Sequence, residues 1–83
     1  RQEEVDFVVK SGLKVTQLIQ VCQDVEDAAA KDREIRALVK ASDELRCSNL
    51  LVITEDYEAE EAAEGKKVSW LPLWKWLLGF TPS

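Results

Sequence analysis

The sequence contains no histidine and no methionine, and it has only two cysteines. Zinc sites in proteins need three or four cysteine or histidine ligands at short spacings, so the common zinc folds are excluded. Cys22 ends a strand-like run, and Cys47 ends the helix predicted after it. That helix would be on the order of 28 Å long, whereas a disulfide needs Cα atoms within about 7 Å. We therefore expect two free thiols, as in a cytoplasmic protein.

Long apolar segments and a secretory signal are also missing. The longest apolar-rich run, Val68–Phe80, is too short to span a bilayer and is interrupted by Pro72 and Lys75. The N-terminus lacks the basic and apolar pattern of a signal peptide. We expect a cytoplasmic protein with no membrane partner. Since methionine is absent even from residue 1, we also expect a fragment of a longer protein.

Outside one acidic segment, the sequence has only a weak excess of basic residues. The net charge is −5, and Glu55–Glu64 carries six acids and no base, which leaves eleven bases and ten acids elsewhere. Proteins that bind nucleic acid usually show a clear basic excess or stripe. The candidate nucleic-acid-binding residues lie on one predicted helix: Lys31, Arg33, Arg36 and Lys40. A solvated helix face explains them as well, because Asp32 and Arg36 have the i,i+4 spacing of an ion pair.

Hydrophobic periodicity predicts one small α/β domain over residues 1–83. A domain of this length buries only about 60–65% of its unfolded surface, so a deep active-site cavity is not expected. Residues 4–9 alternate as a strand with one buried face, and Gly12 suits a tight turn. Residues 13–22 resume a strand pattern, which predicts an antiparallel hairpin.

A helix and a central strand follow the hairpin. Asp27 is a good N-cap for a helix to about Arg46, with an apolar stripe formed by Ile35, Leu38, Val39, Ser42 and Leu45. Leu50–Thr54 is an uninterrupted apolar run, typical of a strand buried on both faces and parallel to the strand before the helix.

The C-terminal third leaves more alternatives. The acidic segment 55–64 is compatible with a loop, a frayed helix or the outer strand of a hairpin, and we interpret its charge as solubilising a sheet edge. Gly65–Lys67 predicts a turn, Val68–Leu71 a strand, and the residues after Pro72 a short helix ended by Gly79. For the three tryptophans in this part the alternatives are a lid on the sheet, a partner interface and, last, a membrane-surface contact: Trp70, Trp74 and Trp76.

Two neighbouring strands place polar residues where a nuclease would need them. Gln20 and Cys22 share one face of the second strand, and the hairpin brings Asp6 beside them. Phosphodiester hydrolysis needs oxygen ligands for Mg²⁺ and a group that orients the attacking water. The order strand, strand, helix, strand resembles the core of the restriction-endonuclease-like (PD-(D/E)XK) fold.

A more specific resemblance covers residues 4–78. The segments "EVDFVV", "LIQVC", "REIRALVKAS" and "LLVITEDYE", the Gly-Lys-Lys turn and "LPLWKWLL" are similar to the C-terminal nuclease-like domain of archaeal AAA-type ATPases. The resemblance implies a P-loop ATPase module as partner. Because these residues contain no Gly-rich phosphate loop, ATP binding is not assigned to them.

The resemblance also implies positions for a metal site. Asp6 occupies the position of the family's first metal-binding acid. Gln20 occupies the position of its second acid, and Cys22 occupies the position of its lysine. Glutamine coordinates without charge, and cysteine lacks a fixed positive charge. Glu4, which shares a face with Asp6, would offset the lost carboxylate. A base on the helix, such as Arg36 or Lys40, would replace the lysine.

Three functions remain open from the sequence. The first is a non-catalytic nuclease-like module that binds DNA, the ATPase or another copy of itself. The second is a Mg²⁺-dependent DNA endonuclease with a rearranged site built from Asp6, Gln20 and Glu4. The third is a structural or oligomerisation domain, most simply a twofold homodimer. Cys22 is interpreted as an apolar filler, because no histidine is present to activate it as a nucleophile.

Overall fold

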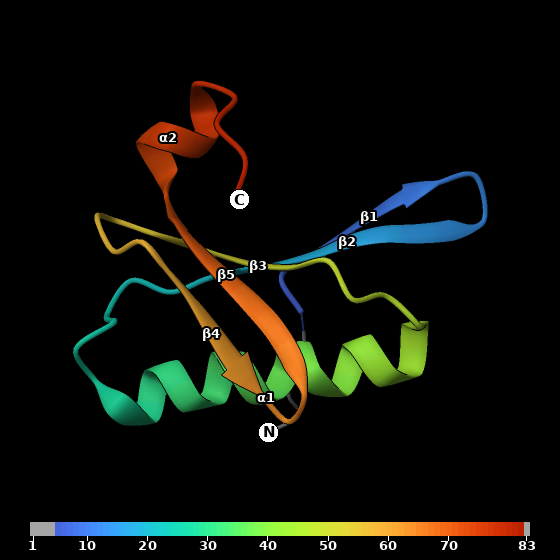
Figure 1. Ribbon diagram of the computed structural model, residues 1–83, viewed down its shortest axis with the longest axis horizontal. Helices are drawn as coiled ribbons and strands as arrows, with labels where there is room; N and C mark the ends of the chain where they lie inside the picture. The colour runs from blue at the N-terminus through green and yellow to red at the C-terminus, as the bar shows by residue number, and fades with distance from the viewer. Residues whose placement is uncertain (1–4, 83) are drawn as a thin grey trace.

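The computed structural model describes residues 5–82 as a mixed five-stranded sheet with two helices (Figure 1). The elements in chain order are β1 (Phe7–Ser11), β2 (Lys14–Val21), α1 (Ala28–Leu45), β3 (Leu50–Thr54), β4 (Ala59–Ala63), β5 (Lys66–Pro72) and α2 (Leu73–Leu77). The predicted α/β class is confirmed. Glu4, one of the expected metal ligands, lies outside the described residues.

The sheet has three parallel strands at its centre and an antiparallel strand at each edge. The strand order is β1-β2-β3-β5-β4; β3 runs parallel to β2 and to β5, whereas β1 and β4 run antiparallel to their neighbours. Helix α1 lies along one face of the sheet, and α2 stands on the opposite side (Figure 1). The chain therefore covers only one face of its sheet with a long helix.

The β1–β2 hairpin forms as predicted, with Gly12 in the left-handed region at φ +62°. Its burial differs from the prediction. All five residues of β1 are exposed, and Phe7 retains 58% of its accessible surface. The expectation that this strand buries one face is wrong because α1 contacts β2 and β3 but does not extend over the edge strand.

Local signals define both ends of α1. Asp27 Oδ1 accepts hydrogen bonds from the backbone N–H groups of Ala29 (2.9 Å) and Ala30 (3.4 Å), which satisfies donors that no helix can pair internally. Arg46 ends the helix in the left-handed conformation at φ 55°. Most of the predicted stripe is buried, but Leu45 is 42% exposed because it lies in the last turn of the helix.

Strand β3 is the centre of the core, as its uninterrupted apolar pattern predicted. All five of its residues are buried. One face of the sheet packs against Leu38 of α1 with the side chains of Leu18, Leu50, Val52, Val68 and Trp70. The other face buries Ile19, Leu51, Ile53 and Leu71. Both cysteines are free and buried, as expected.

Of the three alternatives for the acidic segment, the outer strand of a hairpin is the one observed. Strand β4 pairs with β5 at the edge of the sheet, and the turn between them places Glu64 and Gly65 at φ 52° and 79°. Helix α2 follows Pro72 and ends before Gly79, which has a φ of 87°. Within residues 5–82, no helix is both long enough and apolar enough to cross a membrane.

Candidate functional site

Asp6 and Gln20, two of the residues that the sequence assigned to a metal site, meet where β1 begins and β2 ends. The backbone N–H of Asp6 donates to Gln20 Oε1 at 2.5 Å, and Asp6 Oδ2 accepts from the N–H of Val21 at 2.8 Å. Gln20 is 2% exposed, and its Nε2 donates to Glu34 Oε1 on α1 at 2.8 Å. Both polar atoms of Gln20 are therefore engaged inside the protein.

Glu34 belongs to this polar cluster, although the sequence analysis did not single it out. Burial raises the pKa of the Glu34 carboxyl, and the negative charge of Asp6 raises it further, with a partial offset from Arg33. The helical spacing of the sequence already indicated that Glu34 faces the sheet. It lies four residues before the buried Leu38, so it shares the face of α1 that meets the sheet.

A hollow of about 500 Å³ lies beside the cluster and is bounded by the carboxylates of Asp6 and Glu34, by Arg33 and by Cys22. Cys22 is 2% exposed and packs in the core with Leu18. Burial raises the pKa of its thiol, so the group is the neutral thiol at neutral pH. Its surroundings agree with the interpretation of Cys22 as a packing residue.

The cluster does not fit a Mg²⁺ centre as it stands. Mg²⁺ prefers oxygen ligands in near-octahedral geometry. Asp6 and Glu34 each have one carboxylate oxygen occupied by a hydrogen bond, and the oxygen of Gln20 is occupied as well. In the part of the chain that the structure describes, no group of three or more acidic, cysteine or histidine side chains is arranged to hold a metal ion.

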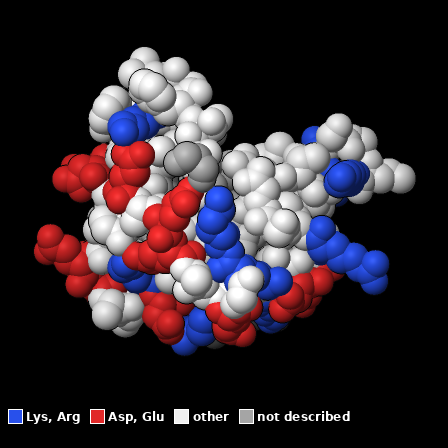
Figure 2. Space-filling model, in the orientation of Figure 1, with Lys and Arg blue, Asp and Glu red and all other residues white. Residues whose placement is uncertain are grey.

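One of the four bases considered for nucleic-acid binding is separated from the rest. Lys31 turns toward the β4–β5 hairpin, whereas Arg33, Arg36 and Lys40 are exposed on α1. Arg33 also borders the hollow beside Glu34, and Arg36 forms the predicted ion pair with Asp32 at 2.9 Å. Basic and acidic side chains alternate along this side of the molecule (Figure 2).

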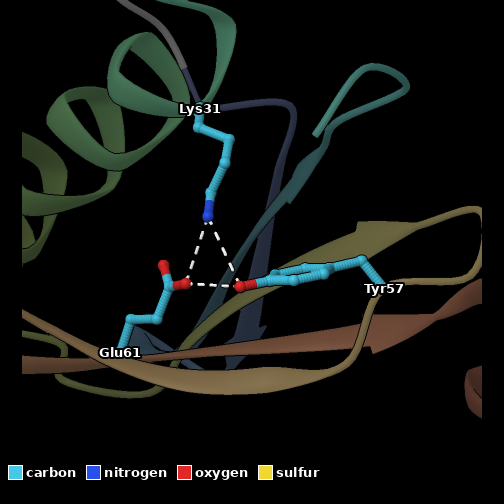
Figure 3. A network of polar contacts seen from close by, with 3 residues as sticks. All are labelled: Lys31, Tyr57 and Glu61. Carbon is cyan, nitrogen blue, oxygen red and sulfur yellow. Dashed lines mark hydrogen bonds and ion pairs between the residues drawn. The ribbon is translucent and has the colours of Figure 1, made fainter. Parts of the chain in front are cut away.

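Lys31 instead joins a partly buried polar network between α1 and the β4–β5 hairpin (Figure 3). Its Nζ lies 3.1 Å from Glu61 Oε2 and 3.4 Å from Tyr57 Oη, and Tyr57 Oη donates to Glu61 Oε2 at 2.6 Å. The same ammonium group lies over the rings of Tyr57 and Trp70, at 4.7 and 4.8 Å from their centroids. This network fastens α1 to the hairpin.

The network shifts the pKa values of its two charged groups. Burial alone would raise the pKa of Glu61, but hydrogen bonds from Tyr57 and Lys31 outweigh it and hold the pKa below its usual value. For Lys31, burial acts to lower the pKa, and the hydrogen bonds with Glu61 and Tyr57 raise it overall. Both groups are therefore charged at neutral pH.

An apolar groove of about 1000 Å³ opens on the face of the sheet that α1 does not cover. Its floor and one wall come from strands, since Phe7 pairs with Ile19, and Val21 with Ile53, on that face. The other wall is α2, with Leu73, Trp74 and Trp76. Trp74 and Trp76 are 54% and 40% exposed.

Trp70 lies in a different environment from the other two tryptophans. It is 1% exposed, packs in the core and meets Tyr57 edge-to-face at 5.5 Å. Among the described residues, its Nε1 is the buried side-chain nitrogen or oxygen that makes no hydrogen bond. Of the three tryptophans, Trp74 and Trp76 are therefore the ones available to a partner.

Comparison with protein-family models, with curated proteins and with solved structures finds no significant match to this chain. Its function is therefore inferred from its own geometry.

Proposed function

We propose that this chain is a non-catalytic, restriction-endonuclease-like module of an archaeal AAA-type ATPase that acts by binding another polypeptide. The observation that carries this proposal is the apolar groove between the β1–β2 hairpin and α2. Exposed apolar surface that is contiguous marks interaction sites, and tryptophan is enriched among the residues that dominate binding energy. Trp74 and Trp76 are available at this surface.

The polar cluster supports the absence of catalysis. Gln20 stands where the resemblance expects the second acid, and its carbonyl oxygen and amide nitrogen are both bound within the protein. Cys22 stands where the resemblance expects the lysine, and it is a buried neutral thiol. The position at which the resemblance expects a charged lysine therefore contributes to packing in this protein.

A polypeptide fits these surfaces better than nucleic acid does. DNA binding depends on bases that neutralise phosphates along a stripe. Arg36 is paired with Asp32, and Lys31 is paired with Glu61 beneath the hairpin. Two of the four candidate bases on α1 are therefore engaged with acids, which leaves a weak stripe for phosphate, whereas the groove offers a partner an apolar surface.

The second candidate is a Mg²⁺-dependent DNA endonuclease. Asp6 and Glu34 favour it, because both border one hollow and because the charge of Asp6 raises the pKa of Glu34. Strongly perturbed carboxyl groups in a cleft are typical of functional sites as well as of structural networks. The two candidates differ in whether divalent metal binds at Asp6.

One NMR titration separates them. Millimolar Mg²⁺ is added to the ¹⁵N-labelled chain, and duplex DNA follows. The proposed function predicts no selective shift of the Asp6, Val21 and Glu34 amides with metal, and none along α1 with DNA. A parallel assay tests cleavage of duplex DNA with Mg²⁺ or Mn²⁺. Cleavage by the wild-type chain that disappears in Asp6→Ala would overturn the proposal in favour of the endonuclease.

A further inference from the structure

We propose that the apolar groove binds a second copy of this chain, in a twofold arrangement that seats the β1–β2 hairpin of each copy in the groove of the other. The proposal rests on the function above, since it names the polypeptide partner of the same groove. Its support comes from the shape of the groove and from the charges of the β1–β2 hairpin and of the segment that follows β3.

The groove has the shape that reciprocal insertion needs. The β1–β2 hairpin and α2 rise on either side of a hollow (Figures 1 and 2). The hairpin wall presents Phe7 and Val9, the floor presents Ile19 and Ile53, and α2 presents Trp76. A projecting apolar wall beside an apolar hollow is complementary to a copy of itself after a twofold rotation.

The β1–β2 hairpin and the segment that follows β3 carry opposite charge. Residues 7–22 contain two lysines, Lys10 and Lys14, and no acid. The segment that follows β3 contains three acids and no base, and its Glu55 lines the groove. Of these acids, Glu58 is paired with Lys75 at 2.7 Å, while Glu55 and Asp56 are exposed.

A twofold rotation brings these opposite charges together. The hairpin lysines of each copy then face Glu55 and Asp56 of the other, so that both ends of the interface are complementary. Complementary charge fixes the register and orientation of a complex more than it adds affinity. The apolar groove supplies the main contact, and the charges select the antiparallel orientation.

The edges of the sheet are less suitable for pairing between copies. Pairing β1 with β1 would bring the Lys10 side chains of both copies near each other. Pairing β4 with β4 would do the same with Glu60. Pairing β1 with β4 would join opposite charges, but a head-to-tail contact of this kind gives a ring or an open filament and not a twofold dimer. Of these arrangements, the face-to-face one gives a twofold dimer with complementary charge.

Sedimentation of the 83-residue chain from micromolar to millimolar concentration gives the first test. We expect a monomer–dimer equilibrium. On dilution, the amides of Val21 and Ile53 and the indole N–H of Trp76 should shift, and those of α1 should not. A monomer at every concentration, or growth beyond the dimer into open polymers, would reject the arrangement.

Charge reversal tests the orientation of the two copies in the dimer. It predicts that the dimer is recovered in a mixture of variants, in addition to being lost in each variant alone. One variant carries Lys10→Glu with Lys14→Glu, and a second carries Glu55→Lys with Asp56→Lys. Each should be monomeric alone, because like charges meet at both ends of its dimer. Their equimolar mixture should restore the dimer as a heterodimer, since each hairpin again faces an opposite charge.

The matched control is Lys40→Glu with Arg46→Glu, which reverses two exposed charges away from the groove. It should dimerise like the wild type. A reversed variant that dimerises alone, or a mixture that stays monomeric while both variants keep dispersed NMR spectra, would overturn the proposal. If the chain is monomeric and neither metal nor DNA shifts its spectrum, the dimer is rejected and the proposed function is not. Cleavage that depends on Asp6 would instead reject the proposed function.

Discussion

The ammonium group of Lys31 lies 4.8 Å from the centre of the Trp70 ring and 3.1 Å from the carboxylate of Glu61. These contacts join the first turns of α1 to β5 and β4, which are remote from α1 in the chain. The side chains of Lys31 and Glu61 are only 24% and 30% exposed. Removing one partner of an ion pair shielded in this way costs more than breaking a pair on the open surface, because the other charge stays partly buried without a partner.

Replacing Lys31 with alanine should therefore destabilise the protein. The substitution leaves Glu61 partly buried without its cation and removes the charge from above two rings. We expect the free energy of unfolding to fall by about 1–3 kcal/mol. Denaturant unfolding measures the change. Lys40→Ala, on the exposed face of the same helix, is the control and should change the free energy by less than about 0.5 kcal/mol.

The same network predicts how stability changes in acid. The pKa of Glu61 is lower in the folded protein than in the unfolded chain. A carboxyl group of this kind stabilises the fold above its unfolded pKa, and this contribution is lost as the pH falls through the folded pKa. Glu61→Gln should thus lower stability at neutral pH and flatten the acid limb of a stability–pH curve. An acid limb identical to that of the wild type would contradict the assignment.

Glu34 should have the opposite effect. Burial and Asp6 raise its folded pKa, so the charged form is disfavoured by folding and the protein gains stability from this group as the pH falls toward the unfolded pKa. Glu34→Gln removes the charge and keeps an oxygen that can accept from Gln20. We expect the variant to be more stable than the wild type at neutral pH and to lose this advantage in acid. Thermal unfolding at several pH values measures it.

Gln20 is the residue whose replacement tests the polar cluster most directly. Gln20→Glu removes the donor to Glu34 and puts a third acid beside Asp6 and Glu34. We expect a loss of about 1–3 kcal/mol without metal, because a buried acceptor loses its donor and like charges meet. Divalent metal should recover part of this loss in the variant and have no effect on the wild type.

The control for this substitution is Ser48→Glu, which adds an acid at an exposed position just before β3 and away from the hollow. It should change neither the stability nor the response to Mn²⁺. A wild-type protein that Mn²⁺ stabilises as strongly as the Gln20→Glu variant would show that the cluster already accepts a metal.

The sequence predicted those elements in which local pattern and tertiary setting agree. The cap at Asp27, the turn at Gly12 and the apolar run of β3 each have one favourable structure, and the structure contains them. The face shared by Gln20 and Cys22 followed from strand alternation alone. Three interpretations of the acidic segment stayed open from the sequence. Its structure depends on pairing with β5, which lies later in the chain.

What sequence reasoning missed depends on contacts between distant elements. Alternation in β1 suggested a buried face, but burial requires a covering element and none of the described residues provides one. Lys31 was taken for a surface base, although it lies four residues before Ile35 on the buried stripe. Its partners, Tyr57 and Glu61, are far away in the chain, and only the fold brings them together.

The position of β5 has a consequence for how the chain is made. Because β5 inserts between β3 and β4, the apolar strand β3 lacks its second neighbour until the ribosome has released residues 66–72. Until then, an unpaired and uncharged edge is exposed, which is the kind of edge that recruits strands from other chains. A nascent chain halted after β4 would therefore be prone to aggregate, and quality control during translation would encounter it in that state.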